Sequence, residues 1–209
     1  KDAAEKISAH KGEIALAFEL NNESVDEKLL RYAVALNATN VFLVEGSTLG
    51  EWATDTSIGK IVYDGKSLAR LQPLTGISFD IDLAAYLVNP GVRASSITDV
   101  ADKWGVPLDT SSPDNLLASQ AAAYFGIKKN LEADLAERGL TDLFIKLELP
   151  VAELLAIMEN RGVAVDTKEL KRLLESGELK VTPQTRANEM IALFGGEGSE
   201  KTLADVSIS

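Results

Sequence analysis

The sequence predicts an α/β domain followed by a helical segment. Short apolar runs of strand-like composition alternate with amphipathic stretches in the first half of the chain, whereas helical patterns dominate the second half. Alternating strands and helices typically pack as a sheet covered by helices. The 209 residues are enough for one such domain with an appendage.

The first half of the chain contains short apolar runs that favour strands. The predicted strands are residues 13–20, 40–46 and 57–65. Residues 24–38 carry apolar side chains at helical spacing behind a possible N-cap, Ser24, so we expect an amphipathic helix there. Residues 31–36 taken alone also fit a strand. A short helix is expected over residues 66–74, stopped near Pro73.

The second half reads as a series of helices. The first is expected to begin near Ile81, and the others to cover residues 95–105, 115–139, 140–162 and 167–177. Asp80 fits the N-cap of the first, and Ser95 or Ser96 that of the second. Pro150 indicates a kink or a new helix start. Residues 163–166 are briefly strand-like, and the pattern fades after residue 179 apart from a helical piece over 185–194.

Composition excludes several classes of site. The chain has no cysteine and one histidine, His10, which argues against disulfides, thiolate metal sites and a Ser-His nucleophile. The net charge of −11 repels phosphate backbones, so we expect DNA contact only weakly or through another part of a larger protein. No apolar run approaches the roughly 20 residues that span a bilayer. We therefore expect a cytoplasmic protein with no membrane partner.

The stretch "LELPVAELLAIMENRGVAVDTKEL" is the most specific in the chain. It resembles the segment of bacterial DNA polymerase I (family A) that leaves the 3′–5′ exonuclease domain and enters the thumb. The matching residues are Glu148, Pro150, Leu154, Met158, Glu159, Gly162, Val163, Val165 and Asp166. Upstream, "FDIDLAAYLVNPGVRASSITDVADKWG" is similar to a stretch of the same family's exonuclease domain.

The resemblance covers residues 14–174 and implies a ribonuclease H-like 3′–5′ exonuclease fold, with a mixed central sheet flanked by helices. We expect residues 1–140 to form a degenerate exonuclease-like domain and residues 141–178 a helical linker that starts the thumb. Residues 179–209 depart from the family and form an atypical tail. The resemblance also implies that the thumb and palm of the same polymerase are its partners.

An active member of that family holds two divalent metals with carboxylates. The resemblance places the family's Asp-x-Glu pair at Glu19 and Asn21, and its Phe-Asp aspartate at Asp80. It places the Tyr-x-x-x-Asp pair at Leu116 and Gln120. Two anions thus remain where four are expected.

These substitutions predict a non-catalytic domain that needs no cofactor and supports the polymerase structurally. Glu19 and Asp80 remain able to bind Mg²⁺ or Mn²⁺ weakly, which leaves a weakly active exonuclease as the alternative. An acidic protein-interaction module derived from the domain is the third reading.

Each of these residues also has an ordinary structural reading. Glu19 fits a solvated strand end, Asp80 a helix cap, and Gln120 a packing edge. Lys128 and Lys129 fit a solvated helix face. The aromatic residues Trp52, Trp104, Tyr124 and Phe125 are expected in the core rather than as base-stacking platforms.

Overall fold

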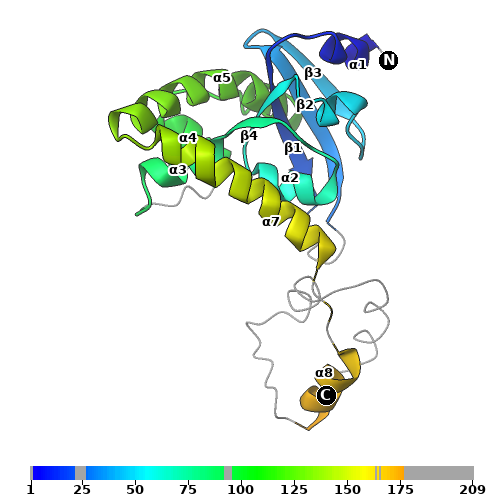
Figure 1. Cartoon of the computed structure of the whole chain (residues 1–209). Coiled ribbons are helices and arrows are strands. Elements are labelled where there is room, and N and C mark those ends of the chain that lie inside the picture. The colour runs from blue at the N-terminus through cyan, green and yellow to red at the C-terminus, as the bar shows by residue number, and fades with distance from the viewer. Residues whose placement is uncertain (1, 22–26, 92–95, 163, 165, 177–209) are drawn as a thin grey trace. The chain divides into compact units, whose positions relative to one another are not determined.

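The computed structural model describes residues 2–21, 27–91, 96–162, 164 and 166–176. Its strands form a five-stranded sheet in the order β3-β2-β1-β4-β5 (Figure 1). The strands are β1 (Glu13–Leu20), β2 (Leu29–Asn37), β3 (Asn40–Glu45), β4 (Gly59–Val62) and β5 (Ile77–Asp80). β1, β2 and β3 run antiparallel, whereas β4 and β5 run parallel to β1, so the sheet is mixed as expected.

Helices lie between and after the strands. In the first half they are α1 (Asp2–Ser8), the 3₁₀ turn η1 (Glu51–Thr54), α2 (Gly65–Leu71) and α3 (Ile81–Val88). In the second half they are α4 (Ile97–Lys103), α5 (Pro113–Glu137), α6 (Thr141–Leu143), the π-helical turn η2 (Phe144–Glu148), α7 (Leu149–Arg161) and α8 (Thr167–Glu175). No described helix is long and apolar enough to cross a membrane.

The helix predicted over residues 24–38 is wrong. Residues Leu29–Asn37 form β2, which lies between β1 and β3 in the sheet. Residues 32–35 are buried, because the sheet is covered on both faces, so they show no alternation of apolar and polar side chains. The alternative strand over residues 31–36 is confirmed, and Ser24 lies outside the described residues.

The two faces of the sheet contribute to different apolar clusters. Ile14 and Leu16 of β1 pack with α1, η1 and α2 on one face. Ala15 and Ala17 point to the other face, where α3, α4 and α5 cover the sheet. Successive side chains of a strand point to opposite faces of the sheet. Because alanine side chains are small, α5 packs closely on β1 and β2. The predicted core positions of Trp52 and Tyr124 are confirmed.

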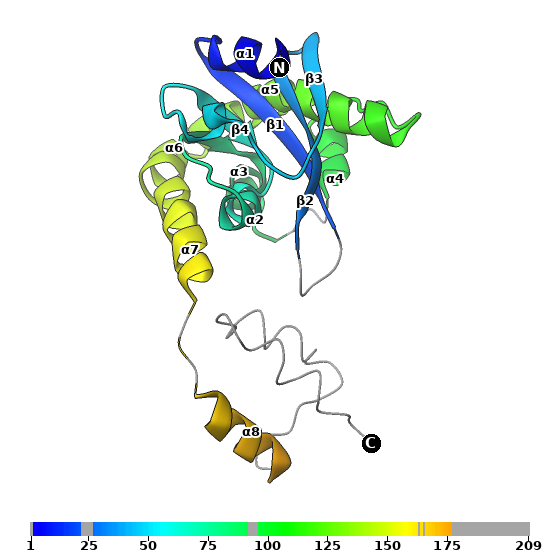
Figure 2. The ribbon, with the colours of Figure 1, turned by 90° about the vertical axis from the view of Figure 1, so that its right-hand side faces the viewer.

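α6, η2 and α7 follow one another after α5 (Figure 2). Phe144 is buried against Phe79 of β5, with ring centroids 4.9 Å apart. α7 begins next to Pro150, as predicted for a new helix start. It ends before Gly162, whose φ of +65° suits the residue after a helix.

Apart from Glu27, the described residues up to Ile157 belong to one compact unit. Glu27, the end of α7 from Met158 onward, and α8 belong to a second. Within α8, the Asp166 side chain accepts hydrogen bonds from the backbone N–H groups of Lys168 and Glu169. The helix predicted at residues 167–177 is therefore confirmed with its own N-cap. The tail from residue 179 lies outside the described residues, as do two of the four residues predicted as a short strand at 163–166.

Candidate functional site

Glu19 lies near the end of β1, directly opposite Arg31 of β2 in the antiparallel pair. The Arg31 guanidinium donates two hydrogen bonds to its carboxylate, from Nε to Oε2 at 2.6 Å and from Nη2 to Oε1 at 3.1 Å. Such a two-pronged contact is the strongest geometry available to an arginine and a carboxylate. Both Glu19 oxygens are therefore already engaged by a cation supplied by the protein itself.

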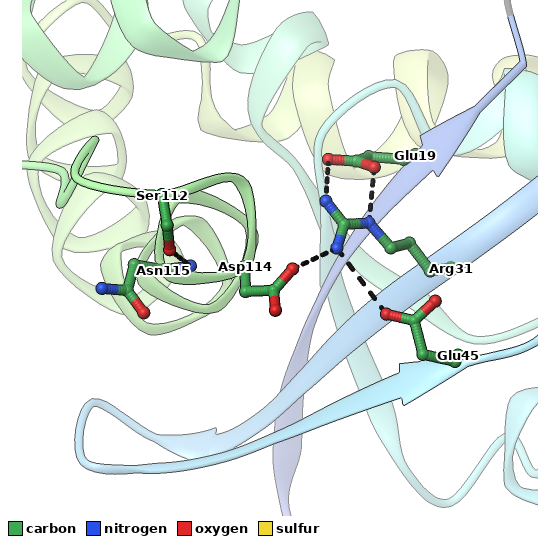
Figure 3. A network of polar contacts seen from close by, with 6 residues as sticks. All are labelled: Glu19, Arg31, Glu45, Ser112, Asp114 and Asn115. Carbon is green, nitrogen blue, oxygen red and sulfur yellow. Dashed lines mark hydrogen bonds and ion pairs between the residues drawn. The ribbon is translucent and has the colours of Figure 1, made fainter.

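Arg31 also gathers two more carboxylates (Figure 3). Its Nη1 donates to Oδ1 of Asp114, in the first turn of α5, and lies 3.6 Å from Oε1 of Glu45 at the end of β3. The Arg31 side chain is 15% exposed, and its hydrogen bonds to Glu19 and Asp114 raise the pKa of the guanidinium. The arginine thus joins β1, β2, β3 and the start of α5 around one fixed positive charge.

Replacing Arg31 by methionine should destabilise the fold by about 1 kcal/mol, between the values for exposed and buried ion pairs. The change leaves three carboxylates close together without their cation. Because salt screens that repulsion, the loss should shrink in 1 M NaCl. Denaturant unfolding at low and high salt measures it, with the exposed Lys129→Met on α5 as the control for removing one positive charge. Equal losses for the two variants would contradict this role.

Asn21 takes part in closing the end of the β1–β2 pair. Its side-chain Oδ1 accepts a hydrogen bond from the backbone N–H of Lys28 at 2.6 Å, and its backbone N–H donates to the Lys28 carbonyl at 3.0 Å. The amide side chain therefore serves the backbone where the two strands part. Asn and Asp commonly hold turns in this way.

Asp80 is the last residue of β5 and is buried, with 2% of its surface exposed. Oδ2 accepts the backbone N–H of Gly65 at 2.8 Å, at the start of α2. Oδ1 accepts the N–H of Asp82 at 3.0 Å and that of Leu83 at 3.4 Å, at the start of α3. The predicted N-cap is confirmed, and the same carboxyl group also ties down a second helix.

The surroundings of Asp80 are tightly packed and low in polarity. A Cβ on Gly65 would lie 2.6 Å from Val62 Cγ2 and 3.1 Å from Asp80 Oδ2, so only glycine fits beside the carboxyl group. Burial raises the pKa of Asp80 to about 7, against the lowering effect of the hydrogen bonds from Gly65 and Leu83. Burial also raises the pKa of Tyr124 on α5.

Leu116 and Gln120 lie one turn apart on α5, and both are half-buried. They supply no charge to the region between α5 and the sheet. Within the part of the chain that the structure describes, no three acidic or histidine side chains come close enough to hold a metal ion. The five predicted positions thus offer two carboxyl groups, each already bonded within the protein.

Lys128 is not the solvated surface residue that its sequence context predicts. Its side chain is 14% exposed, and the ammonium is paired with Glu13 of β1 and with Glu132. It also lies 5.7 Å from the centre of the Phe79 ring. The acidic residues that follow it on α5 predict a solvated helix face. The lysine side chain instead points inward, and its ion pair with Glu13 links α5 to the start of β1.

Comparison with known proteins places this fold. Residues 25–111 match the family model described as DNA polymerase I, ribonuclease H-like domain. This part of the chain is similar to the ribonuclease H-like domain of DNA polymerase I. DNA polymerase I of Bacillus subtilis (strain 168) is 30% identical over 178 residues, which covers 72% of this chain and 20% of that protein. The chain therefore spans about a fifth of the length of that relative.

Solved structures agree with the family match. The POL domain of Pol1 from M. smegmatis, in complex with DNA primer-template and dNTP, superposes with a TM-score of 0.70 at 26% identity, over 84% of this chain and 33% of that one. Brucella melitensis NrnC gives 0.55 at 17% identity, over 70% and 85% of the chains, which shows the fold alone. The predicted ribonuclease H-like fold, followed by helices, is confirmed.

The exonuclease-like domain does not fit a two-metal centre. Such a centre needs several free carboxylate oxygens around hard cations. Here the Glu19 oxygens face a guanidinium and the Asp80 oxygens face backbone N–H groups. The sequence did not indicate Arg31, because the apolar spacing of residues 24–38 predicts a helix. It did not indicate Asp114, because this residue meets Arg31 only in the tertiary structure. Read as a strand, residues 24–38 would have placed Arg31 near Glu19.

Proposed function

We propose that this chain is a non-catalytic exonuclease-like domain that supports the polymerase module of a DNA polymerase I in replication and repair. The proposal rests on the observation that the carboxyl groups of Glu19 and Asp80 are both already hydrogen-bonded within the protein. Glu19 is neutralised by Arg31, and Asp80 holds the first turns of α2 and α3. A metal ion would have to displace a bidentate guanidinium in one case and unfold two helix caps in the other.

The charge of the chain supports a structural role. A net charge of −11 disfavours independent capture of DNA, because phosphate binding relies on lysine and arginine. We therefore propose that DNA reaches this protein only through the polymerase part, and that the domain needs no metal cofactor. Residues 1–140 serve as the exonuclease-like body, and residues 141–178 serve as the helical connection to the thumb.

Incubation of the chain with a single-stranded, labelled oligonucleotide and 5–10 mM Mg²⁺ or Mn²⁺, concentrations of the order usual in such assays, should give no shortening from the 3′ end. The physical reason is that no pair of metals can assemble without free carboxylates. Gel electrophoresis over a time course reads the result, with an active proofreading exonuclease as the positive control.

Two matched variants make the assay decisive. Glu19→Gln removes a charge from the predicted metal position, whereas Glu45→Gln removes one from the more exposed carboxylate on the same arginine. Shortening that Glu19→Gln abolishes and Glu45→Gln leaves intact would overturn the proposal in favour of a weakly active exonuclease.

A further inference from the structure

A cavity of about 350 Å³ lies where α3, α4 and α5 end, and we call it the α3–α5 cavity. The three helices pack together on one face of the sheet (Figure 1). The cavity is lined by Val88 and Asn89 from α3, Lys103 and Trp104 from α4, and Asp134 and Arg138 from α5. Asp80 precedes the eight residues of α3, so the cavity lies about 12 Å from that position. Sites for small organic ligands usually measure roughly 300–1,000 Å³, so one small molecule fits here.

Trp104 forms an apolar wall of this cavity and is held firmly in place. Its indole Nε1 donates to Oδ2 of Asp134 at 2.8 Å, and its carbonyl accepts from Nδ2 of Asn130 at 3.0 Å. Both bonds tie the end of α4 to α5. Val88, which is 4% exposed, adds an apolar side chain to the lining. Because the wall is already fixed, a ligand that packs on it needs little further ordering of side chains.

Two cations line the same cavity without a carboxylate partner. Asp134 and Arg138 are four residues apart on α5, a spacing that favours an ion pair. Asp134 instead binds the Trp104 indole, and among the described residues Arg138 has no ion pair. The Lys103 ammonium lies 4.7 Å from the centre of the Trp104 ring and, in the same part of the chain, also has no ion pair. In a chain of net charge −11, this cavity is therefore a local site for an anion.

A phosphate attached to a flat ring matches these groups. A phosphate monoester carries about −1.5 to −2 charges at pH 7, which two cations balance better than one. The Arg138 guanidinium suits paired phosphate oxygens, and an indole wall suits an aromatic base. The amide of Asn89, which has no hydrogen bond within the residues that the structure describes, offers a donor and an acceptor for the edge of a base such as adenine.

We propose that the α3–α5 cavity binds a free nucleoside monophosphate, with the base against Trp104 and the phosphate on Lys103 and Arg138. The site is separate from Glu19 and Asp80, and it does not depend on the proposed function. A free nucleotide and the end of a single strand carry the same groups. The net charge of −11 repels every phosphate of a strand but only one phosphate of the free nucleotide, which favours the free form.

Equilibrium dialysis of the 209-residue chain against deoxyadenosine monophosphate tests the site. We expect a dissociation constant of about 1 mM or lower. Deoxyadenosine lacks the phosphate and 2-deoxyribose 5-phosphate lacks the base, so each should bind at least about tenfold more weakly. In NMR spectra the indole N–H signal of Trp104 should shift on addition of the nucleotide. The signal of the other tryptophan, Trp52, which is 2% exposed, should stay in place.

Matched variants locate the site. Arg138→Gln should weaken the binding of deoxyadenosine monophosphate at least about tenfold, because a charge-assisted contact to the phosphate is lost. Its melting temperature should remain that of the native chain, since the side chain is exposed. Lys129→Gln removes one positive charge from the same helix at an exposed position outside the lining, and it should leave the affinity unchanged.

Several results would overturn this site. One is the absence of binding at about 1 mM nucleotide, and another is an equal loss of affinity in Arg138→Gln and Lys129→Gln. Equal affinities for deoxyadenosine monophosphate and 2-deoxyribose 5-phosphate would show a site for anions alone. Tighter binding of a short single-stranded oligonucleotide than of the mononucleotide would replace the free nucleotide by a strand end. These measurements use no metal ion and do not depend on the outcome of the nuclease assay.

Discussion

Replacing Phe144 by alanine should lower the free energy of unfolding by about 3–5 kcal/mol. The ring is 2% exposed and packs on Phe79 of β5 with centroids 4.9 Å apart at 55°. Tilted aromatic pairs add to the energy of buried area. The residue lies in η2, so the loss should fall on the contact that holds α6 and the start of α7 to the sheet.

Denaturant unfolding followed by circular dichroism measures the loss. The neighbouring Ile145, which is 54% exposed, supplies the matched control, and Ile145→Ala should change the free energy of unfolding by less than about 0.5 kcal/mol. Phe144→Leu keeps most of the buried volume and should fall in between. A Phe144→Ala variant as stable as Ile145→Ala would show that η2 is not anchored through this ring.

The second large effect is expected at Asp80. Asp80→Ala should destabilise the fold by about 2–4 kcal/mol, because it removes the cap of α3 and leaves buried N–H groups without acceptors. The groups concerned are the backbone N–H groups of Gly65, Asp82 and Leu83. Thermal and denaturant unfolding measure the loss. Asp102→Ala, at an exposed position in α4, is the control and should be nearly neutral. A neutral Asp80→Ala would contradict the double-cap role.

Asp80 should also make stability depend on pH in an unusual direction. Its pKa is about 7 in the folded protein, against an ordinary value of 3.8, so the folded state keeps a proton that the unfolded state releases. The free energy of unfolding should therefore fall as the pH rises from about 4 to about 7, and this contribution should level off above that range. Glu13 has a lowered pKa, so its contribution to the free energy of unfolding is lost as the pH falls, which is the opposite pH dependence.

The difference between the native chain and Asp80→Asn, measured at each pH, isolates this contribution. Asparagine retains the shape of the side chain but does not titrate in this range. The stability of Asp80→Asn relative to the native chain should improve as the pH rises from 4 to 7, values spanning the two pKa values above. A constant difference would show that Asp80 is ionised throughout.

Local signals in the sequence were sufficient for elements that carry their own start and stop. Ser96 caps α4 by accepting the N–H of Asp99 at 3.2 Å, and Gly162 follows α7 in the left-handed conformation. The helical pattern of α5 and the two strands β1 and β4 were also read correctly. These features depend on hydrogen bonds and spacing within a few residues, which a single chain displays directly.

Local sequence patterns did not predict every strand of the buried sheet. β2 was mistaken for a helix, and β5, which is four residues long, was not recognised as a strand. Lys60 of β4 is fully buried, with its ammonium bonded to the carbonyl of Asp55. Nothing in the local pattern distinguishes such a lysine from one in water.

The family resemblance predicts that the carboxylates of an exonuclease site are depleted, because residues 21, 116 and 120 carry no acid. The sequence by itself determined that Asp80 begins a helix. Only the tertiary structure decided what became of the two acids that remain. Glu19 meets Arg31 across a strand pair, and Asp80 reaches the start of α2, fifteen residues away along the chain. Asp80 and Gly65 are brought together only by folding, whereas the pairing of Glu19 with Arg31 follows once residues 29–37 form a strand, which their local pattern did not indicate.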